Sequence, residues 1–181
     1  MRNPVVKILL LALLCGTLSA CATETMRNLL PTDVIGKKNA IVIGRVISDK
    51  SGLGVLVHEN DHSNPSAYIW IEPAHKTGDR FERVFAMEVD AGYVKYTNVK
   101  SGAMYANMFG AEDPYTFAPA GQITYIGDLV VNVGSFARVS FRLTDNNAAT
   151  IGDVKKEMPW LFDKYPTNSK DIKKRHSEIG E

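Results

Sequence analysis

The sequence contains only two cysteines among its 181 residues, Cys15 and Cys21. Cys15 belongs to an N-terminal segment that is expected to be removed, so the mature chain would keep one cysteine and could form no internal disulfide. The folded part must then be stabilised by a hydrophobic core and by backbone hydrogen bonds. A single domain of about 150 residues buries enough surface for this.

The sequence also lacks an excess of charge of either sign. It has 21 Lys and Arg against 20 Asp and Glu, and removal of the first twenty residues would take away Arg2 and Lys7, leaving a net charge of −1. Binding to nucleic acid needs a clear basic excess, because its affinity comes largely from phosphate contacts. We therefore expect no nucleic-acid partner.

Residues 1–20 have the order of a bacterial export signal. Arg2 and Lys7 give a charged beginning, residues 8–14 form an unbroken apolar run, and small residues lead to Ala20. The apolar run is too short to span a bilayer permanently. The pattern predicts a removable signal peptide over residues 1–20.

The segment Leu18-Ser19-Ala20-Cys21 resembles the lipobox of bacterial lipoproteins. The resemblance implies that Cys21 becomes the first mature residue and carries a diacylglycerol and an N-acyl chain. Each buried methylene contributes about 0.8 kcal/mol, so two or more acyl chains would hold the protein firmly on a membrane. Ala22 stands where an aspartate would resemble the inner-membrane retention signal, so we expect the periplasmic face of a Gram-negative outer membrane. The alternative is an ordinary secretory signal followed by a chance cysteine.

The mature chain divides into three predicted parts. Residues 21–39 show no sustained hydrophobic periodicity, which predicts a lipidated tether. Residues 40–146 hold about seven to nine short strands with turn signals between them and no helical period, which favours an antiparallel β-sandwich of prealbumin or immunoglobulin type. Residues 147–181 predict a helical and polar C-terminal segment.

Several connections between these strands are specific enough to predict. Ser51-Gly52 suggests that residues 40–47 and 53–57 form neighbouring strands. The turn Asp90-Ala91-Gly92 predicts a hairpin between residues 81–89 and 93–99, because glycine adopts positive φ cheaply.

Farther along, Gly134-Ser135 matches a two-residue type II′ turn, which would pair residues 129–133 with residues 136–144 in antiparallel fashion. Apolar and polar residues alternate in the second of these segments, so one face should be buried. The preceding strand is expected to bend at Gly127.

A helix is predicted after residue 147. Thr150 and Asp153 have the spacing of a capping box, and apolar residues follow at helical spacing. Pro159 is expected to begin a second helical turn, because proline is tolerated at the first position of a helix.

Several motifs between residues 89 and 166 resemble those of a group of uncharacterised bacterial lipoproteins. They are the Asp90-Ala91-Gly92-Tyr93 turn, Phe117-Ala118-Pro119-Ala120-Gly121, Tyr125-Ile126-Gly127-Asp128-Leu129, Asp145 and Tyr165-Pro166. The resemblance implies a prealbumin-like β-sandwich and no known activity.

One segment could carry catalytic chemistry. His58-Glu59-x-x-His62 matches the signature in which two histidines on a helix bind zinc and the glutamate activates water. Residues 53–57 predict a strand and residues 63–65 a turn, so the helix that this geometry needs is not expected. We favour a solvated loop over an adventitious metal site and over a zinc hydrolase, and we expect no bound metal and no other cofactor besides the lipid on Cys21.

Other residues have a functional and a structural interpretation. Tyr68 and Trp70 share a strand face and would form either an exposed binding patch or, in our preference, part of the core. Asp128 and Asp145 are expected to cap or orient turns. The basic cluster at residues 170–176 would either touch anionic lipid headgroups or, as we favour, stay solvated.

These observations favour a binding protein over an enzyme. The anchor motif is specific, whereas the mature chain offers no free thiol and no serine in a G-x-S-x-G elbow. We therefore expect a non-catalytic binding or envelope-assembly module, held on the membrane by its lipid and offering loops or an edge strand to an envelope protein. The alternative is a lipid-anchored zinc hydrolase that uses His58, Glu59 and His62.

Overall fold

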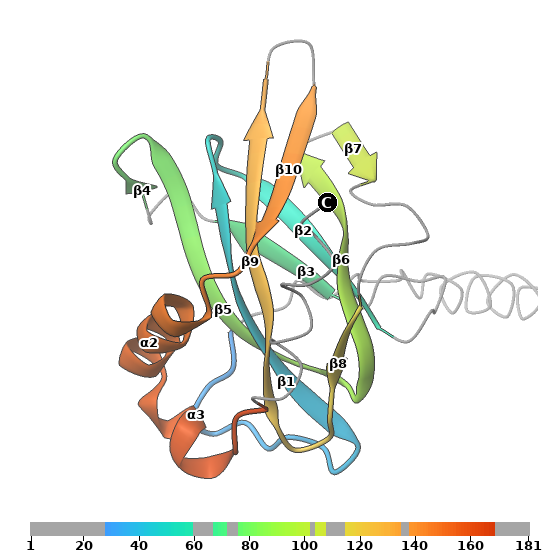
Figure 1. The fold of residues 1–181 in the computed structure, drawn as a ribbon, viewed down its shortest axis with the longest axis vertical. Helices are drawn as coiled ribbons and strands as arrows, with labels where there is room; N and C mark the ends of the chain where they lie inside the picture. Colours follow the sequence, from blue (N-terminus) through green and yellow to red (C-terminus); the bar gives the residue numbers. More distant parts are fainter. Residues whose placement is uncertain are drawn as a thin grey trace, which may run out of the picture.

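The computed structural model describes residues 28–59, 67–71, 76–101, 104–107, 115–134 and 138–168. These residues are mainly β, with two short helices at the C-terminal end, as expected (Figure 1). The elements are β1 (Asn39–Ser48), β2 (Leu53–Glu59), β3 (Ala67–Ile71), β4 (Lys76–Thr77), β5 (Arg80–Asp90), β6 (Gly92–Ser101), β7 (Met104–Asn107), β8 (Thr116–Ala118), β9 (Ile123–Val133), β10 (Val139–Thr144), α2 (Asn147–Glu157) and α3 (Pro159–Lys164).

The strands form two sheets. Sheet 1 has the order β10-β9-β1-β5-β4, and sheet 2 has the order β3-β2-β6-β7, with β8 also paired to β6. Most pairs are antiparallel, as predicted, but β1 runs parallel to β9. A parallel pair needs a crossover connection, and here the chain passes through sheet 2 between the two strands. Sheet 1 is therefore mixed.

The main core lies between the two sheets. Val42 and Val46 of β1 meet Val55 of β2 and Tyr96 of β6 in one buried cluster. A second cluster joins sheet 1 to the helices and includes Ile41 of β1. Because β1 is covered on both faces, its sequence is a nearly continuous run of apolar residues and does not alternate between apolar and polar residues.

Two of the predicted pairs of neighbouring strands are wrong. Residues 81–89 and 93–99 do not form a hairpin, because β5 pairs with β1 in sheet 1 whereas β6 pairs with β2 in sheet 2. The short link at Ala91 turns the chain from one sheet to the other. Residues 40–47 and 53–57 likewise lie in different sheets. In the sequence, a glycine-containing turn between two apolar segments looks the same whether the two strands pair in one sheet or lie in different sheets.

The predicted pairing of β9 with β10 is confirmed, although its turn is longer than expected. Val133 lies opposite Val139, so residues 134–138 connect the strands instead of the two residues Gly134-Ser135. The Gly134 N–H donates to the Arg138 carbonyl at 2.8 Å. Phe141, on the predicted buried face, packs against the main core.

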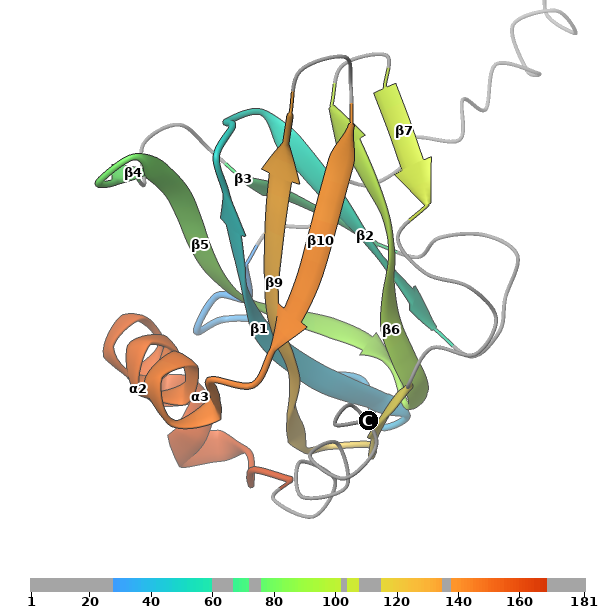
Figure 2. The same ribbon diagram turned by 45° about the horizontal axis from the view of Figure 1, so that its top comes forward.

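The helices cover the outer face of sheet 1, as both ribbon views show (Figures 1 and 2). Pro159 occupies the first turn of α3, as predicted. The capping box is wrong, because α2 begins at Asn147 and places Thr150 inside the helix, where it is buried. No helix in the described ranges is long and apolar enough to cross a membrane.

The end of the predicted tether lies against sheet 1. Leu29 is buried in the second cluster, and its N–H donates to the Ala86 carbonyl of β5 at 3.0 Å. Residues 21–27 lie outside the described residues. The chain is thus held on the side of sheet 1 from Asn28 onward.

Candidate functional site

A β-bulge in β9 brings polar side chains together beneath α2. Ile43 of β1 lies opposite Tyr125, but Arg45 lies opposite Asp128, so β9 contains one extra residue at this point. Gly127 supplies it with a φ of 102°, which confirms the predicted bend. An extra residue changes which side chains face the same side, so Tyr125 and Asp128 both point toward the helices.

Asp128 is the centre of the resulting cluster. Its side chain is 1 % exposed and accepts hydrogen bonds from the Tyr125 hydroxyl at 2.9 Å and from the Thr150 hydroxyl at 2.8 Å. The expectation that Asp128 caps or orients a turn is therefore wrong, because this carboxylate joins β9 to α2. Asp145 does orient a turn, since its carboxylate accepts from the Asn147 N–H at 3.2 Å.

Arg45 provides the positive charge of this cluster. Its guanidinium lies 2.6 Å from the Glu82 carboxylate and 2.5 Å from the Asp153 carboxylate. Its Nε lies 3.8 Å from Asp128 Oδ2 and, within the described residues, has no hydrogen-bond partner. One buried cation therefore links β1, β5, β9 and α2.

The electrostatics of the cluster follow from burial. Burial raises the pKa of Asp128, although the hydrogen bonds from Thr150 and Tyr125 and the charge of Arg45 act in the opposite direction. Burial likewise raises the pKa of the Tyr125 hydroxyl. The hydrogen bond from Lys156, together with that from Arg45, lowers the pKa of Asp153.

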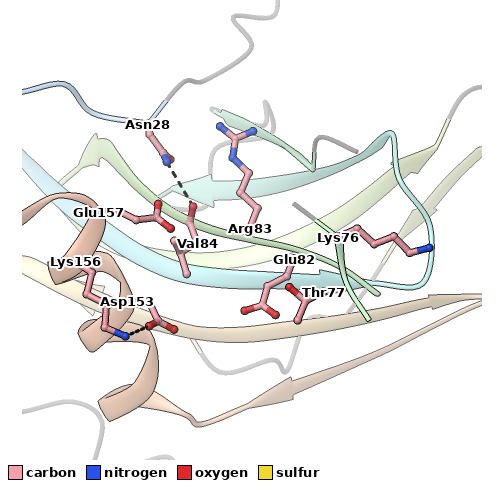
Figure 3. A pocket seen from close by; sticks show the side chains of 9 residues that line it. All are labelled: Asn28, Lys76, Thr77, Glu82, Arg83, Val84, Asp153, Lys156 and Glu157. Atoms are coloured by element: carbon pink, nitrogen blue, oxygen red, sulfur yellow. Dashed lines mark hydrogen bonds and ion pairs between the residues drawn. The ribbon is translucent and has the colours of Figure 1, made fainter. Parts of the chain in front are cut away.

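A pocket with a cavity volume of about 520 Å³ lies beside this cluster (Figure 3). Side chains from β4, β5 and α2 surround it, with Asn28 at one side. Its charged lining is balanced, with three bases, Lys76, Arg83 and Lys156, against three acids, Glu82, Asp153 and Glu157. The lining therefore favours neither an anion nor a cation. The described residues contain no group of three or more His, Cys, Asp or Glu side chains placed to hold a metal ion.

A second arrangement lies on sheet 2, where aromatic rings from two strands meet. The ring centres of Tyr93 and Phe117 are 5.3 Å apart, and those of Tyr93 and Tyr115 are 6.1 Å apart. Tyr93 of β6 lies opposite Phe117 of β8 in register. Their neighbours Val94 and Ala118 point into the core, so both rings point outward.

The same outer surface carries positive charge. Lys95 places its ammonium 4.3 Å from the ring centre of Tyr115, a cation–π contact. Lys100 lies opposite Tyr105 of β7, and both follow the outward direction because Val99 points into the core. We call this surface, made of Tyr93, Lys95, Lys100, Tyr105, Tyr115 and Phe117, the aromatic face.

The aromatic face is accessible. Tyr93 is 56 % exposed, Tyr105 is 54 % exposed and Phe117 is 43 % exposed. A group of large exposed aromatic side chains makes this surface a candidate interaction site. β7 and β8 lie at opposite ends of β6 (Figure 2). The aromatic face therefore has two parts at the two ends of β6, and Asn98 between them is only 7 % exposed.

The residues singled out from the sequence are only partly placed. His58 and Glu59 lie at the end of strand β2, whereas their side chains and His62 lie outside the described residues. Tyr68 and Trp70 lie in β3, opposite Leu56 and Gly54, and their side chains are also outside the description. Cys21 lies outside it as well.

Both arrangements in the structure were missed from the sequence. Arg45 and Asp128 are single charges inside otherwise apolar strands, and such isolated charges signal a buried ion pair. For the aromatic face, Tyr115 and Phe117 are two residues apart and therefore share one side of a strand.

No protein-family model and no curated protein matches the chain.

Proposed function

We propose that the protein is a lipid-anchored, non-catalytic binding module on the periplasmic face of the outer membrane. Its two sheets would form a prealbumin-like β-sandwich, and its aromatic face would be the binding surface. The observation that carries this proposal is the exposed contact of Tyr93 with Tyr115 and Phe117.

The distribution of the side chains supports binding over catalysis. Asp128, the acid with a raised pKa, is buried and fully engaged by Tyr125 and Thr150. It does not line the pocket, so it holds α2 on sheet 1 and is not offered to a substrate. The aromatic face, in contrast, has its ring surfaces in water, where an envelope component can reach them.

The anchor is tested by the variant Cys21→Ser. The wild-type protein should be recovered in the outer-membrane fraction with acyl chains on its first residue, measured by mass spectrometry. The variant should be soluble or unprocessed. An unchanged membrane fraction for the variant, or a wild-type amino terminus without acyl chains, would refute the anchored part of the proposal.

The binding surface is tested by site-specific photo-crosslinking in cells. A photoreactive phenylalanine analogue replaces Tyr93 or Phe117, and the matched control replaces Val34, which is 86 % exposed and lies before β1. We expect discrete crosslinked products from the first two positions and none from the third. Equal labelling at all three positions, or no product at positions 93 and 117, contradicts the assignment of this surface.

A further inference from the structure

The segment of residues 30–34, which lies before β1, exposes aliphatic side chains to water. Leu30 is 47 % exposed and Val34 is 86 % exposed, and within the described ranges they are the only aliphatic residues among the large exposed hydrophobic ones. Pro31 and Thr32 between them are exposed and Asp33 is half-buried, so the two side chains belong to one uninterrupted stretch of surface. Such a surface favours an apolar contact.

Hydrogen bonds hold this segment in a fixed shape. Before it, the buried Leu29 is bonded to β5, and after it the Gly36 N–H donates to the Glu88 carboxylate at 2.8 Å. Within it, the Asp33 N–H donates to the Leu30 carbonyl at 2.9 Å, and the Asp33 carboxylate accepts from the Leu30 N–H at 2.7 Å. Because the segment is already ordered, it loses little conformational entropy when it binds.

The proposed lipid lies close to this segment along the chain. Cys21 precedes Asn28 by seven residues, and seven residues span at most roughly 25 Å when fully extended. Residues 30–34 therefore stay near the bilayer surface whenever the lipid is inserted. The short connection gives them a high effective concentration at that surface, so a contact made by only two side chains can form there although it would be negligible for a free protein.

Helix α3 places two residue types that are typical of a membrane interface beside this segment. The Lys164 ammonium lies 5.3 Å from the ring centre of Trp160, and it donates to the Pro31 carbonyl at 3.0 Å. Trp160 is half-buried against the second cluster. Tryptophan and lysine are found at the boundary between headgroups and hydrocarbon, because each has an apolar part and a polar end.

Charge contributes little to this surface. Lys37 and Lys38 are exposed beside it, but Asp33 lies within it. Asp90 is exposed next to Lys38 as well, because the following Ala91 N–H donates to the Lys38 carbonyl at 3.1 Å. Attraction to anionic headgroups is therefore a minor contribution, and the apolar contact has to provide most of the binding.

We propose that residues 30–34 contact the bilayer in which Cys21 is anchored, with Leu30 and Val34 at the level of the headgroups and the first methylenes. This inference rests on the proposed function, since it needs the lipid on Cys21. The blue segment that passes beneath α3 at the lower end of Figure 1 would face the membrane, and the beginning of β10 at the upper end would point away from it. The domain would then be held at two places.

The experiment uses the full acylated chain in vesicles of phosphatidylethanolamine and phosphatidylglycerol. A small aliphatic diazirine amino acid replaces Leu30 or Val34, and the control replaces Ser140, which is exposed at the beginning of β10. Light expels nitrogen from the diazirine, and the carbene that remains inserts into a bond of a neighbouring molecule, so mass spectrometry records contact with lipid as a lipid adduct. We expect adducts at positions 30 and 34, equally at low and high salt, and none at position 140.

Variants then test whether the apolar character of the segment is needed. In the chain with the probe at position 30, Val34→Asp should lower the yield of adduct several-fold, because a carboxylate is costly among acyl methylenes. Val34→Leu should preserve the yield. Ser140→Asp is the matched control and should change nothing. Val34 is mostly in water, so these variants should fold normally, which circular dichroism verifies.

The outcomes separate this inference from the proposed function, because flotation with the vesicles and the mass of the first residue report the anchor by themselves. If the acylated protein floats but positions 30 and 34 give no lipid adducts, or no more than position 140, the inference is wrong and the anchor stands. An unchanged yield with Val34→Asp also refutes it. If the first residue carries no acyl chain, the anchored part of the proposed function fails and this inference fails with it.

The same probe distinguishes a lipid from a protein in cells. A lipid adduct adds one lipid mass and gives no crosslinked protein, so position 34 remains a control for protein partners. A discrete crosslinked protein at positions 30 and 34 would assign this surface to a protein and overturn the inference.

Discussion

Arg45 holds three carboxylates from three different elements, so its removal tests the architecture beneath α2. The variant Arg45→Met keeps most of the side-chain volume and removes the charge. Loss of one partner of a buried ion pair costs about 3–5 kcal/mol. Glu82 and Asp153 are 27 % and 38 % exposed and can regain water, whereas Asp128 at 1 % cannot. We therefore expect Arg45→Met to lower the free energy of unfolding by about 3 kcal/mol, the lower end of this range.

The loss of stability caused by Arg45→Met should depend on pH and should increase as the pH rises. In the wild type, Asp153 has a lowered pKa, so its pairing stabilises the fold above the ordinary carboxyl pKa and is lost in acid. Without Arg45, the pKa of Asp128 rises further, so the folded variant loses stability as this group ionises with rising pH. Both effects make the difference between wild type and variant larger at about pH 8 than at about pH 4.

Urea unfolding of the full chain at the two pH values measures the difference. The variant should also melt about 6–12 °C lower near neutral pH. Arg142→Met, at an exposed position of β10, is the control and should change stability by less than about 0.5 kcal/mol. The double variant Arg45→Met with Asp128→Asn should recover part of the loss. A penalty below about 1 kcal/mol, or one that is equal at both pH values, would refute the role given to Arg45.

Three further perturbations test the packing around the cluster, all by urea unfolding. Thr150→Val should cost about 1–2 kcal/mol, because the buried Asp128 loses a donor, whereas Thr150→Ser should be nearly neutral. Gly44→Ala should lower stability by about 2 kcal/mol or more, because a Cβ there would lie 2.5 Å from Tyr96 Oη. Gly152→Ala in α2 should instead raise stability by about 0.5–1 kcal/mol, because a Cβ there meets nothing within 4 Å. Burial raises the pKa of Asp128, so this group lowers the free energy of unfolding as pH rises past the ordinary carboxyl pKa, and Asp128→Asn should remove that pH-dependent contribution.

The local structure could be predicted from the sequence to a large extent. Alternation in β10, the bend at Gly127 and the start of α3 at Pro159 depend on neighbouring residues and on backbone preferences. These predictions are confirmed because no distant part of the chain competes with them.

The assignment of strands to sheets could not be predicted in the same way. The link between β5 and β6 satisfies the rules for a hairpin, and only the pairing of β5 with β1 shows that the chain changes sheets there. The buried cluster has the same cause, since Arg45 and Thr150 are far apart in sequence and meet only through β9 and α2. Pairing between residues far apart in the sequence decides both the assignment of strands to sheets and the formation of the buried cluster. The local sequence pattern does not indicate such pairing.

The central position of β1 has a consequence for biosynthesis. Both strands that flank it, β5 and β9, are made later, because the ribosome adds residues from the amino end. Until β9 has been made, a strand rich in Val and Ile has an unfilled hydrogen-bonding edge, which is a template for aggregation with other chains. Sheet 1 therefore cannot be completed until the chain has been made as far as β9, and its folding should be slow because these contacts are distant in sequence.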